Sequence, residues 1–327
     1  MRIAVTGSIA TDHLMTFQGR FADSLVVEQL DQVSLSFLVE DLQVRRGGVA
    51  ANIAFGLANL GLTPLLVGSV GEDFVDYRSW LTRHGVDCGG VRVSQLLHTA
   101  RFICTTDSDQ AQIASFYAGA MSEAREIEFG PLGEREPIDL VVVSPNDPEA
   151  MLRHTEECRA RGLPFAADPS QQLAWSDGPV IRQLVDGAAY LFSNDYEAAL
   201  ITQKTGWTEA DVLARVGVRV TTHGKNGVMI QRRGEDDIRV PVVPAERIAD
   251  PTGVGDGFRA GFLAGLAWGL SLRRCAEVGC LLATLVLETV GTQEYVLGHA
   301  DFLARLAKTY GDDAATEVEP FLKTWRP

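Results

Sequence analysis

The sequence predicts an α/β fold in which a mostly parallel sheet carries helices on both faces. Two observations predict it. Short apolar runs alternate with helix patterns along most of the chain, and strands that alternate with helices form a parallel sheet covered on both sides. In addition, two segments break this alternation and carry strand patterns of their own, which predicts a second, smaller β element.

The buried strands are short apolar runs that end at glycine or at a polar residue. Ile3–Thr6 is the first and stops at Gly7, as expected for a strand buried on both faces. Further strands are expected at Pro64–Val70, Leu140–Val143, Pro164–Ala167, Tyr190–Ser193 and Arg219–Thr222. Ligands of such sheets bind beyond the carboxyl ends of the strands. We therefore expect the residues that lie there to share one site, namely Gly7–Asp12, Asp168, Asn194 and Thr222.

Helix patterns fill the intervals between these strands. They are expected at Asn52–Leu60, at Tyr77–His84, at Glu149–Arg161, at Phe258–Leu270 and, as one amphipathic helix, at Asp301–Trp325. Gly61 and Gly85 follow two of them and are suited to end a helix.

Two segments do not fit the alternation. Asp31–Arg45 carries no helix signal and alternates in part, at Val33, Leu35, Phe37 and Val39. Ala100–Phe116 predicts a hairpin, in which Arg101–Thr106 and Ala111–Phe116 flank the polar turn of residues 107–110.

Composition restricts the class of protein. The 327 residues, 46% of them hydrophobic, suit a single α/β unit with an added lobe. The net charge of −14 argues against binding to nucleic acid or to an anionic membrane, but not against ATP, since local backbone donors and magnesium can outweigh a distant charge. Five scattered cysteines without a Cys-x-x-Cys pair indicate reduced thiols rather than zinc. With no signal-peptide layout and no apolar stretch long enough to span a bilayer, we expect a cytoplasmic protein.

The most informative stretch is the run of residues 249–258, Ala-Asp-Pro-Thr-Gly-Val-Gly-Asp-Gly-Phe. It places a glycine-rich turn and a carboxylate directly before a helix, whose free N–H groups bind anions. Asp256 is poorly placed to bind phosphate itself, but well placed to take a proton from a hydroxyl that attacks phosphate. The run is neither a P-loop nor a dinucleotide fingerprint. It indicates phosphoryl transfer to an alcohol, with a tight turn capped by Asp256 as the alternative.

The same run resembles the C-terminal motif of the ribokinase-like (PfkB) carbohydrate and nucleoside kinases. Other motifs of that family are matched in the same chain order, at Gly7–Asp12, Gly47–Asn52, Asn194–Glu197 and Thr222–Gly227. Each match is weak alone, but five ordered matches over nearly the whole chain are specific together. Within the family, the chain is similar to bacterial adenosine kinases at Val5–Leu14, Val33–Leu38, Ala111–Arg125 and Asn146–Gln172.

The resemblance implies a ribokinase-like fold with a small β-sheet lid over the substrate. Residues 13–45 and 100–116 would form the lid, and residues 1–12, 46–99 and 117–327 the large domain. The implied reaction moves the γ-phosphoryl group of ATP to the 5′-hydroxyl of adenosine, giving AMP and ADP, a step of purine salvage. A ribokinase or another sugar kinase of the family stays open, as does a nucleoside-binding protein without catalysis. The exposed edges of a lid sheet favour a homodimer formed through the lid.

In this reading Asp256 is the general base. The backbone N–H groups of Gly253, Val254 and Gly255 would stabilise the transferring phosphoryl group. Asp12 would hold the sugar hydroxyls, with Ser8, Gly48 and Asn52 completing the polar set, although Asn52 would equally serve as a helix N-cap.

Aromatic residues of the lid distinguish a purine from a plain sugar. A purine offers a flat face that rings can sandwich, and Phe37, Phe102 and Phe116 lie on the two β segments. Ser36 and Met121 are nearby, and Gln171 and Gln172 are placed to recognise the edge of the base. Alternatively, the phenylalanines form the core of the lid or a dimer contact.

The remaining motifs concern ATP and cations. The resemblance assigns ATP to Asn194, Thr222, His223, Gly224, Lys225, Asn226 and Gly227. Glu197 would hold Mg²⁺ through water, because Mg²⁺ prefers oxygen ligands and keeps several waters. Asp250 and Thr252 match positions that bind a monovalent cation such as K⁺ in some relatives. For Asn194 and Glu197 the alternative is a helix cap, for Lys225 a solvated side chain, and for Asp250 a turn acid.

Overall fold

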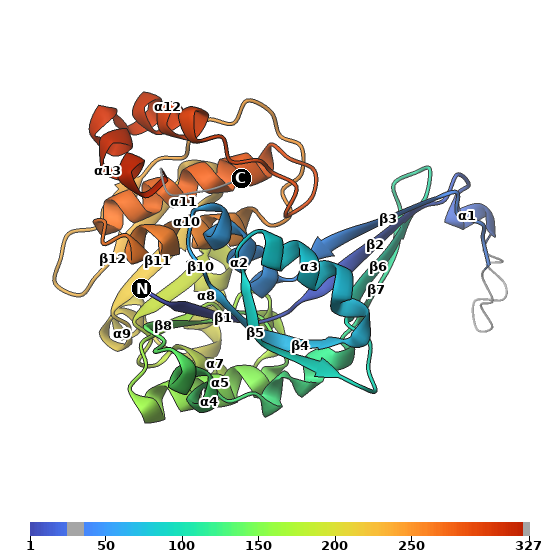
Figure 1. Ribbon diagram of the computed structural model, residues 1–327, viewed down its shortest axis with the longest axis horizontal. Helices are drawn as coiled ribbons and strands as arrows, with labels where there is room; N and C mark the ends of the chain where they lie inside the picture. The colour runs from blue at the N-terminus through green and yellow to red at the C-terminus, as the bar shows by residue number, and fades with distance from the viewer. Residues whose placement is uncertain (25–35, 323–327) are drawn as a thin grey trace.

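A computed structural model describes residues 1–24 and 36–322 of the chain (Figure 1). Within these residues the strands form a nine-stranded sheet and a four-stranded sheet. The strands of the large sheet, in spatial order, are β13 (Ile238–Val240), β12 (Val228–Gln231), β11 (Val218–Thr222), β10 (Tyr190–Asn194), β9 (Phe165–Ala167), β8 (Leu140–Val143), β1 (Ile3–Thr6), β4 (Leu65–Gly71) and β5 (Asp87–Ser94). Those of the small sheet are β3 (Asp41–Gly47), β2 (Ala10–Thr16), β6 (Ala100–Thr106) and β7 (Gln112–Tyr117).

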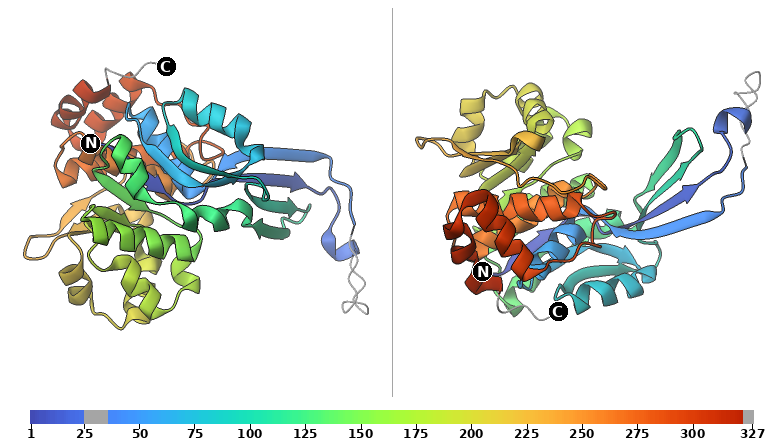
Figure 2. Two further views of the ribbon diagram at one scale, coloured as in Figure 1. Left: turned by 60° about the horizontal axis from the view of Figure 1, so that its bottom comes forward. Right: turned by 90° about the horizontal axis from the view of Figure 1, so that it is seen from above.

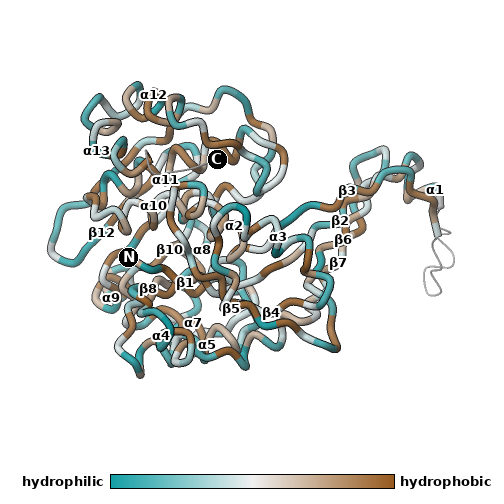
Figure 3. The backbone as a smooth tube through the Cα atoms, viewed as in Figure 1, coloured by the Kyte–Doolittle hydropathy of each residue, from teal (hydrophilic) through white to brown (hydrophobic). Residues whose placement is uncertain are grey.

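Helices cover both faces of the large sheet, and the two views of Figure 2 separate the layers. One buried core joins the sheet to α2 (Val49–Asn59), α3 (Val75–Arg83), α10 (Val254–Ala267), α11 (Leu272–Leu287), α12 (His299–Tyr310) and α13 (Asp312–Leu322). A second core joins the other face to α4 (Phe129–Arg135), α5 (Pro148–Arg161), α7 (Gly178–Val185), α8 (Asp195–Thr205) and α9 (Glu209–Arg215). Shorter elements are α1 (Phe21–Ser24), α6 (Gln172–Trp175), η2 (Glu72–Phe74), η3 (Gly119–Glu126) and η4 (Gly224–Asn226). Figure 3 shows hydrophobic residues along the strands between these layers.

Strand direction places the polar loops together. The seven strands from β11 to β5 are parallel, while β12 and β13 continue the sheet antiparallel. The loops that follow β1, β8, β9, β10 and β11 therefore leave from one edge of the sheet. Strand β4 is buried along its whole length, as is β8, which agrees with the continuous apolar runs that predicted them.

The small sheet projects from the body of the molecule as an arm (Figures 1 and 2). Its strands β2 and β3 continue without a break into residues 10–12 and 46–47. The sequence assigned these residues to the large domain, and the division of the chain into domains stays a prediction. At the far end of the arm, Phe37 packs against Phe17 and Phe21, with ring centroids 4.9 and 5.3 Å away.

Most predicted elements occur within a few residues of their expected bounds. The prediction of one helix at Asp301–Trp325 was wrong, because two helices occur there. α12 ends and α13 begins around Gly311, whose φ of 96° favours glycine and breaks the helix. Strands β5, β12 and β13 were not predicted, since β5 contains two consecutive glycines and β12 and β13 have only four and three residues. The parts of the expected segments that fall on residues 31–35 and 323–325 lie outside the described residues. In the described part of the chain, no helix is long and apolar enough to cross a membrane.

Candidate functional site

Asp256 lies in the first turn of α10, where two cavities meet. One cavity, of about 390 Å³, lies toward the small sheet and is lined by Asp12, Asn52, Phe102 and Asp256, among others. The second, of about 620 Å³, lies toward β10 and β11 and is lined by Asn194, Glu197, Gly255 and Asp256, among others. Of the residues that the structure describes, Asp256 is the one that borders both. We refer to them as the lid-side cavity and the strand-side cavity.

The turn before α10 is built to expose backbone donors. Gly253 is the N-cap and adopts a φ of 77°, and a Cβ there would lie 2.8 Å from Thr292 Cγ2, so glycine is required on both counts. Among the described residues, the N–H groups of Gly255 and Asp256 have no hydrogen-bond partner. Free N–H groups at a helix N-terminus attract an anion. Gly253 borders the lid-side cavity, whereas Val254 and Gly255 border the strand-side cavity.

The Asp256 carboxylate is held by a network of side chains behind it. Asn52 Nδ2 donates to Asp256 Oδ2 over 2.8 Å. Asn52 Oδ1 in turn accepts from Gln293 Nε2 over 2.9 Å and lies 2.9 Å from Thr292 Oγ1. Desolvation by the surrounding protein raises the pKa of Asp256 to about 7, against the opposing effects of the Asn52 hydrogen bond and of Arg259. A carboxylate with a pKa near neutrality is suited to accept a proton in catalysis.

The lid-side cavity has a polar end and an aromatic wall. Asp12 extends from β2, and desolvation raises its pKa to about 6, while Arg45 opposes this rise. Ser8 Oγ accepts a hydrogen bond from Val49 N, and Gly48 adopts a φ of 93° where a Cβ would meet Ser8 O at 2.6 Å. The aromatic wall consists of Phe102 and Phe116, which face each other across β6 and β7, together with Met121.

Gln171 and Gln172 both border the lid-side cavity. Gln172 Nε2 donates to the backbone oxygen of Asn146 over 3.0 Å, so this amide donor is already used within the protein. Ser170 Oγ donates to Gln171 Oε1 over 3.2 Å, while the structure shows no partner for the Gln171 amide nitrogen among the described residues.

Two residues expected near the substrate lie elsewhere in this chain. Neither Ser36 nor Phe37 borders the lid-side cavity, because Phe37 belongs to the aromatic cluster at the far end of the arm. Of the three predicted phenylalanines, Phe102 and Phe116 border the lid-side cavity in this structure, and a substrate role for Ser36 and Phe37 stays a prediction.

The strand-side cavity gathers most of the residues expected to bind a nucleotide. Asn194, Thr222, Gly224, Lys225 and Gly227 line it. His223 and Asn226 do not, and His223 Nδ1 instead lies 2.5 Å from Asp195 Oδ1. The apolar part of the wall comes from loop and helix residues that the sequence did not single out, including Val242, Pro244, Ile248, Ala283 and Leu287.

Asn194 and Glu197 form a capping box at the start of α8. Glu197 N donates to Asn194 Oδ1 over 2.8 Å, and Asn194 N donates to Glu197 Oε2 over 2.9 Å. The capping alternative and a ligand role are therefore compatible, since both residues also border the strand-side cavity. Carboxylate and amide oxygens at the edge of a cavity are a donor set that suits Mg²⁺, which one or two carboxylates and the substrate phosphates usually hold.

Asp250 makes the contacts of a turn acid, and its role at a monovalent-cation site stays a prediction. Its Oδ1 accepts from Thr252 N over 2.9 Å, its Oδ2 accepts from Gly291 N over 3.2 Å, and Arg45 lies 3.7 Å away. Thr252 borders the lid-side cavity. Among the described residues, no group of three or more His, Cys, Asp or Glu side chains is arranged to hold a metal ion.

Sequence reasoning did not single out Arg259, Thr292 and Gln293. Arg259 borders the strand-side cavity and pairs with Asp168, with Nη2 2.5 Å from Asp168 Oδ1. One signal could have found it: a lone arginine within the apolar run Phe258–Leu270, since buried charges are paired. Thr292 and Gln293 act on Asn52 from more than 200 positions away, and no local pattern marks them.

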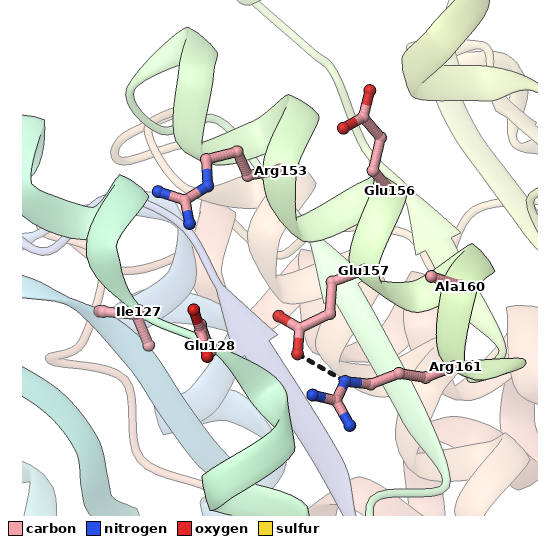
Figure 4. Close-up of a pocket in the computed structure, with 7 residues that line it drawn as sticks. All are labelled: Ile127, Glu128, Arg153, Glu156, Glu157, Ala160 and Arg161. Carbon is pink, nitrogen blue, oxygen red and sulfur yellow. Dashed lines mark hydrogen bonds and ion pairs between the residues drawn. The ribbon is translucent and has the colours of Figure 1, made fainter.

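A separate hollow lies beside α5 and shares no residue with the two cavities. Charged side chains of both signs line it, including Glu128, Arg153, Glu157 and Arg161 (Figure 4). Glu157 pairs with Arg161 and accepts the backbone N–H groups of Phe129 and Gly130 at the start of α4. Its charge is thus used to hold α4 in place, and we assign no ligand to this hollow.

Comparisons with known proteins agree with this geometry. The model of the pfkB family of carbohydrate kinases matches residues 8–297. A nucleoside kinase of Methanocaldococcus jannaschii is 27% identical over 294 residues, which cover 89% of this chain and 92% of that protein. The ligand-free structure of a Burkholderia thailandensis nucleoside kinase has a TM-score of 0.85 and 36% identity, over 93% of this chain and 99% of that chain. The same kinase in complex with inosine gives a TM-score of 0.82 and 35% identity, over 94% and 99% of the two chains.

Proposed function

We propose, from the premise that this chain belongs to the pfkB family of carbohydrate kinases, that it is an adenosine kinase. It would transfer the γ-phosphoryl group of ATP to the 5′-hydroxyl of adenosine and release AMP and ADP. The predicted family and the ribokinase-like α/β fold are confirmed by the family match and by the structural likeness. The relatives compared include nucleoside kinases, one solved with inosine. These relatives support a nucleoside acceptor, and the choice of adenosine is our inference.

One observation carries the proposal: Asp256 separates two cavities and lies beside free backbone N–H groups. A phosphoryl transfer needs an acceptor on one side, a donor on the other, and an anion site between them. The strand-side cavity suits the nucleotide, because glycine-rich turns and Asn194 border it. The lid-side cavity suits the acceptor, because Asp12 can accept hydrogen bonds from two vicinal hydroxyls.

The chain's own residues would act in a simple order. Asp12 and Asn52 orient the ribose so that its 5′-hydroxyl faces Asp256. Asp256 accepts the hydroxyl proton as the oxygen attacks the γ-phosphorus in line. The N–H groups of Gly255 and Asp256 stabilise the charge on the transferring group. Glu197 and Asn194 are the residues that would hold Mg²⁺, which would supply charge neutralisation on the phosphates.

The aromatic wall favours a nucleoside over a free sugar. Phe102 and Phe116 offer ring faces to a planar base, which adds about 0.5–1.5 kcal/mol per ring pair beyond area burial. A free ribose would leave this wall uncovered, since it needs mainly hydrogen-bonding groups. The ribokinase of Bacillus subtilis is nevertheless a relative, with 25% identity over 299 residues, and a sugar is therefore tested beside the nucleosides.

We also propose that two chains associate through the small sheet. Exposed apolar side chains gather on its strands, with Leu42, Val44, Ile113, Phe116 and Tyr117 each more than 40% exposed. In the described part of the chain, the outer strands β3 and β7 of this sheet have no strand paired to their outer edges. Exposed edges and apolar patches of this kind favour pairing with another subunit. Size-exclusion chromatography with light scattering should give twice the mass of one chain, and a monomer would refute the association.

For localisation we propose the cytoplasm, which the five buried free cysteines support.

The decisive experiment measures ADP release by the purified protein with MgATP. Adenosine, inosine, ribose, fructose 6-phosphate and no acceptor are compared side by side. We expect the largest kcat/KM with adenosine and only background release without an acceptor. Release with ribose but not with nucleosides would replace the proposal with a sugar kinase. Tight adenosine binding without any ADP would indicate a nucleoside-binding protein instead.

A further inference from the structure

Three carboxylates and one guanidinium lie close together beside and behind the wall of the strand-side cavity. Asp168 follows β9, Glu197 lies in α8, and Asp256 and Arg259 lie one turn apart in α10. Arg259 is 7% exposed and Asp168 is fully buried. Of the described residues that border this cavity, only Arg259 and Lys225 are basic, and Lys225 is on the exposed η4 turn. Arg259 is thus the buried cation of the cavity.

The contacts of Arg259 connect the parts of the proposed catalytic site. Its Nη2 lies 2.5 Å from Asp168 Oδ1 and 4.0 Å from Glu197 Oε2. Its Nη1 donates to the backbone oxygen of Gly255 over 3.1 Å. Gly255 belongs to the turn whose N–H groups would face the transferring phosphoryl group. The guanidinium therefore holds that turn through its backbone oxygen. The planar group also lies over the ring of Phe192, 5.7 Å from its centroid, which limits its freedom to move.

We propose that Arg259 is a positioning residue for phosphoryl transfer, which holds the Gly253–Gly255 turn in place and offsets the charge of the carboxylates facing the nucleotide. The proposal rests on the proposed kinase function. Asp168 is the anchor of this arrangement, because it fixes the guanidinium without itself bordering either cavity. Donors held rigidly before the reaction stabilise a transition state without the cost of rearrangement.

A charge at this place also suits the chemistry of the substrates. ATP brings several negative charges next to Asp256 and Glu197, and like charges would favour protonation of Asp256. The groups that face Asp256 are Asn52 from α2, Arg259 from its own helix, Asp168 beyond β9 and the buried Tyr295. Of these groups Arg259 alone is positive, and together with the Asn52 hydrogen bond it favours the ionised form of Asp256.

The test is designed to separate positioning from folding. Arg259→Met alone leaves Asp168 buried without its partner, which can unfold the protein. The double variant Arg259→Met with Asp168→Asn removes both charges and should fold.

We expect the double variant to lower kcat about tenfold to a hundredfold, somewhat less than the loss of an anion-hole donor. The KM for ATP should change less than about threefold, and the acid limb of the kcat/KM pH profile should move to higher pH. Arg259→Lys keeps the charge and should leave that limb in place.

A matched control is the ion pair of Arg274 and Glu277, two residues of α11 that themselves border neither cavity. Arg274→Met with Glu277→Gln should change the melting temperature while leaving kcat and the pH profile as they were. A folded Arg259→Met/Asp168→Asn protein with wild-type kcat would overturn the positioning role, as would a rise in the KM for ATP without a fall in kcat. If the wild-type protein phosphorylates nothing, the proposed kinase function fails. Calorimetry of MgADP binding by the same variants is then the readout. Weaker MgADP binding by the double variant would mean that Arg259 acts through nucleotide binding, and this result would overturn the positioning role.

Discussion

The two sides of Asp256 are built in different ways. On the strand side, the polar groups are fixed by the large domain: Asn194 and Glu197 cap each other, and Arg259 pairs with Asp168. On the lid side, part of the wall belongs to the projecting sheet, where Phe116 is 54% exposed in the single chain. The large domain therefore carries the machinery for phosphoryl transfer, while the selection of the acceptor depends on the position of the small sheet. Changes on the two sides should accordingly alter different kinetic constants.

The largest loss of turnover is expected on substitution of Asp256, which borders both cavities. Asp256→Asn keeps the shape and a hydrogen bond toward Asn52 but cannot accept the proton. We expect kcat to fall about 10²–10⁴-fold, the usual contribution of a positioned base, while both KM values stay within a few-fold. Steady-state kinetics of ADP release measures this directly.

A matched control for this variant is Asp301→Asn. Asp301 is also an acid in the first turn of a helix, α12, but it is exposed and borders neither cavity. The Asp301→Asn protein should therefore retain full turnover. If Asp256→Asn turned over as fast as Asp301→Asn, Asp256 would be a capping acid only and the mechanism would be wrong.

The pH dependence should report the same group in the unmodified protein. Desolvation raises the pKa of Asp256 to about 7, and only the ionised carboxylate can accept a proton. We therefore expect kcat/KM to fall about tenfold for each pH unit below 7 and to level off above it. Measurement between pH 5 and 9 at saturating Mg²⁺ tests this. A profile that is flat down to pH 5 would mean that Asp256 is not the titrating base.

The lid side should respond through the acceptor alone. Phe102→Ala or Phe116→Ala removes a ring face, and we expect the KM for adenosine to rise about tenfold, in line with the loss of about 1–2 kcal/mol of stacking and burial. The KM for ATP should stay unchanged. Phe17→Ala provides the control, because Phe17 lies in the aromatic cluster at the far end of the arm and borders neither cavity. An unchanged adenosine KM in both cavity variants would favour a sugar acceptor.

On both sides of Asp256, the sequence predicted the residues that local patterns mark and missed those that only long-range contacts bring in, for a physical reason. Residues such as Asn194 and Asp256 follow strands or begin helices, where local patterns mark them, and parallel strand order brings them to one edge. Gln293 and Thr292 reach Asn52 only through the folded chain, and the Asp168–Arg259 pair joins residues 91 positions apart. Phe37 lies in a segment whose alternating pattern predicted a strand. Such a pattern does not say how far Phe37 lies from the site. Local periodicity predicts elements, whereas long-range contacts have no local signal.

The smallest effect tests whether the helix cap at the strand-side cavity has a second role. Asn194→Ala and Thr208→Ala each remove the N-cap of a capping box, at α8 and at α9, and each should cost about 1 kcal/mol in the free energy of unfolding. Only Asn194 borders the cavity, so only Asn194→Ala should also raise the KM for ATP, by a few-fold. Urea unfolding and ATP titrations of both proteins measure the two quantities. Equal losses of stability with unchanged ATP kinetics in both would reduce Asn194 to a structural cap and leave nucleotide binding to the turn of residues 222–227.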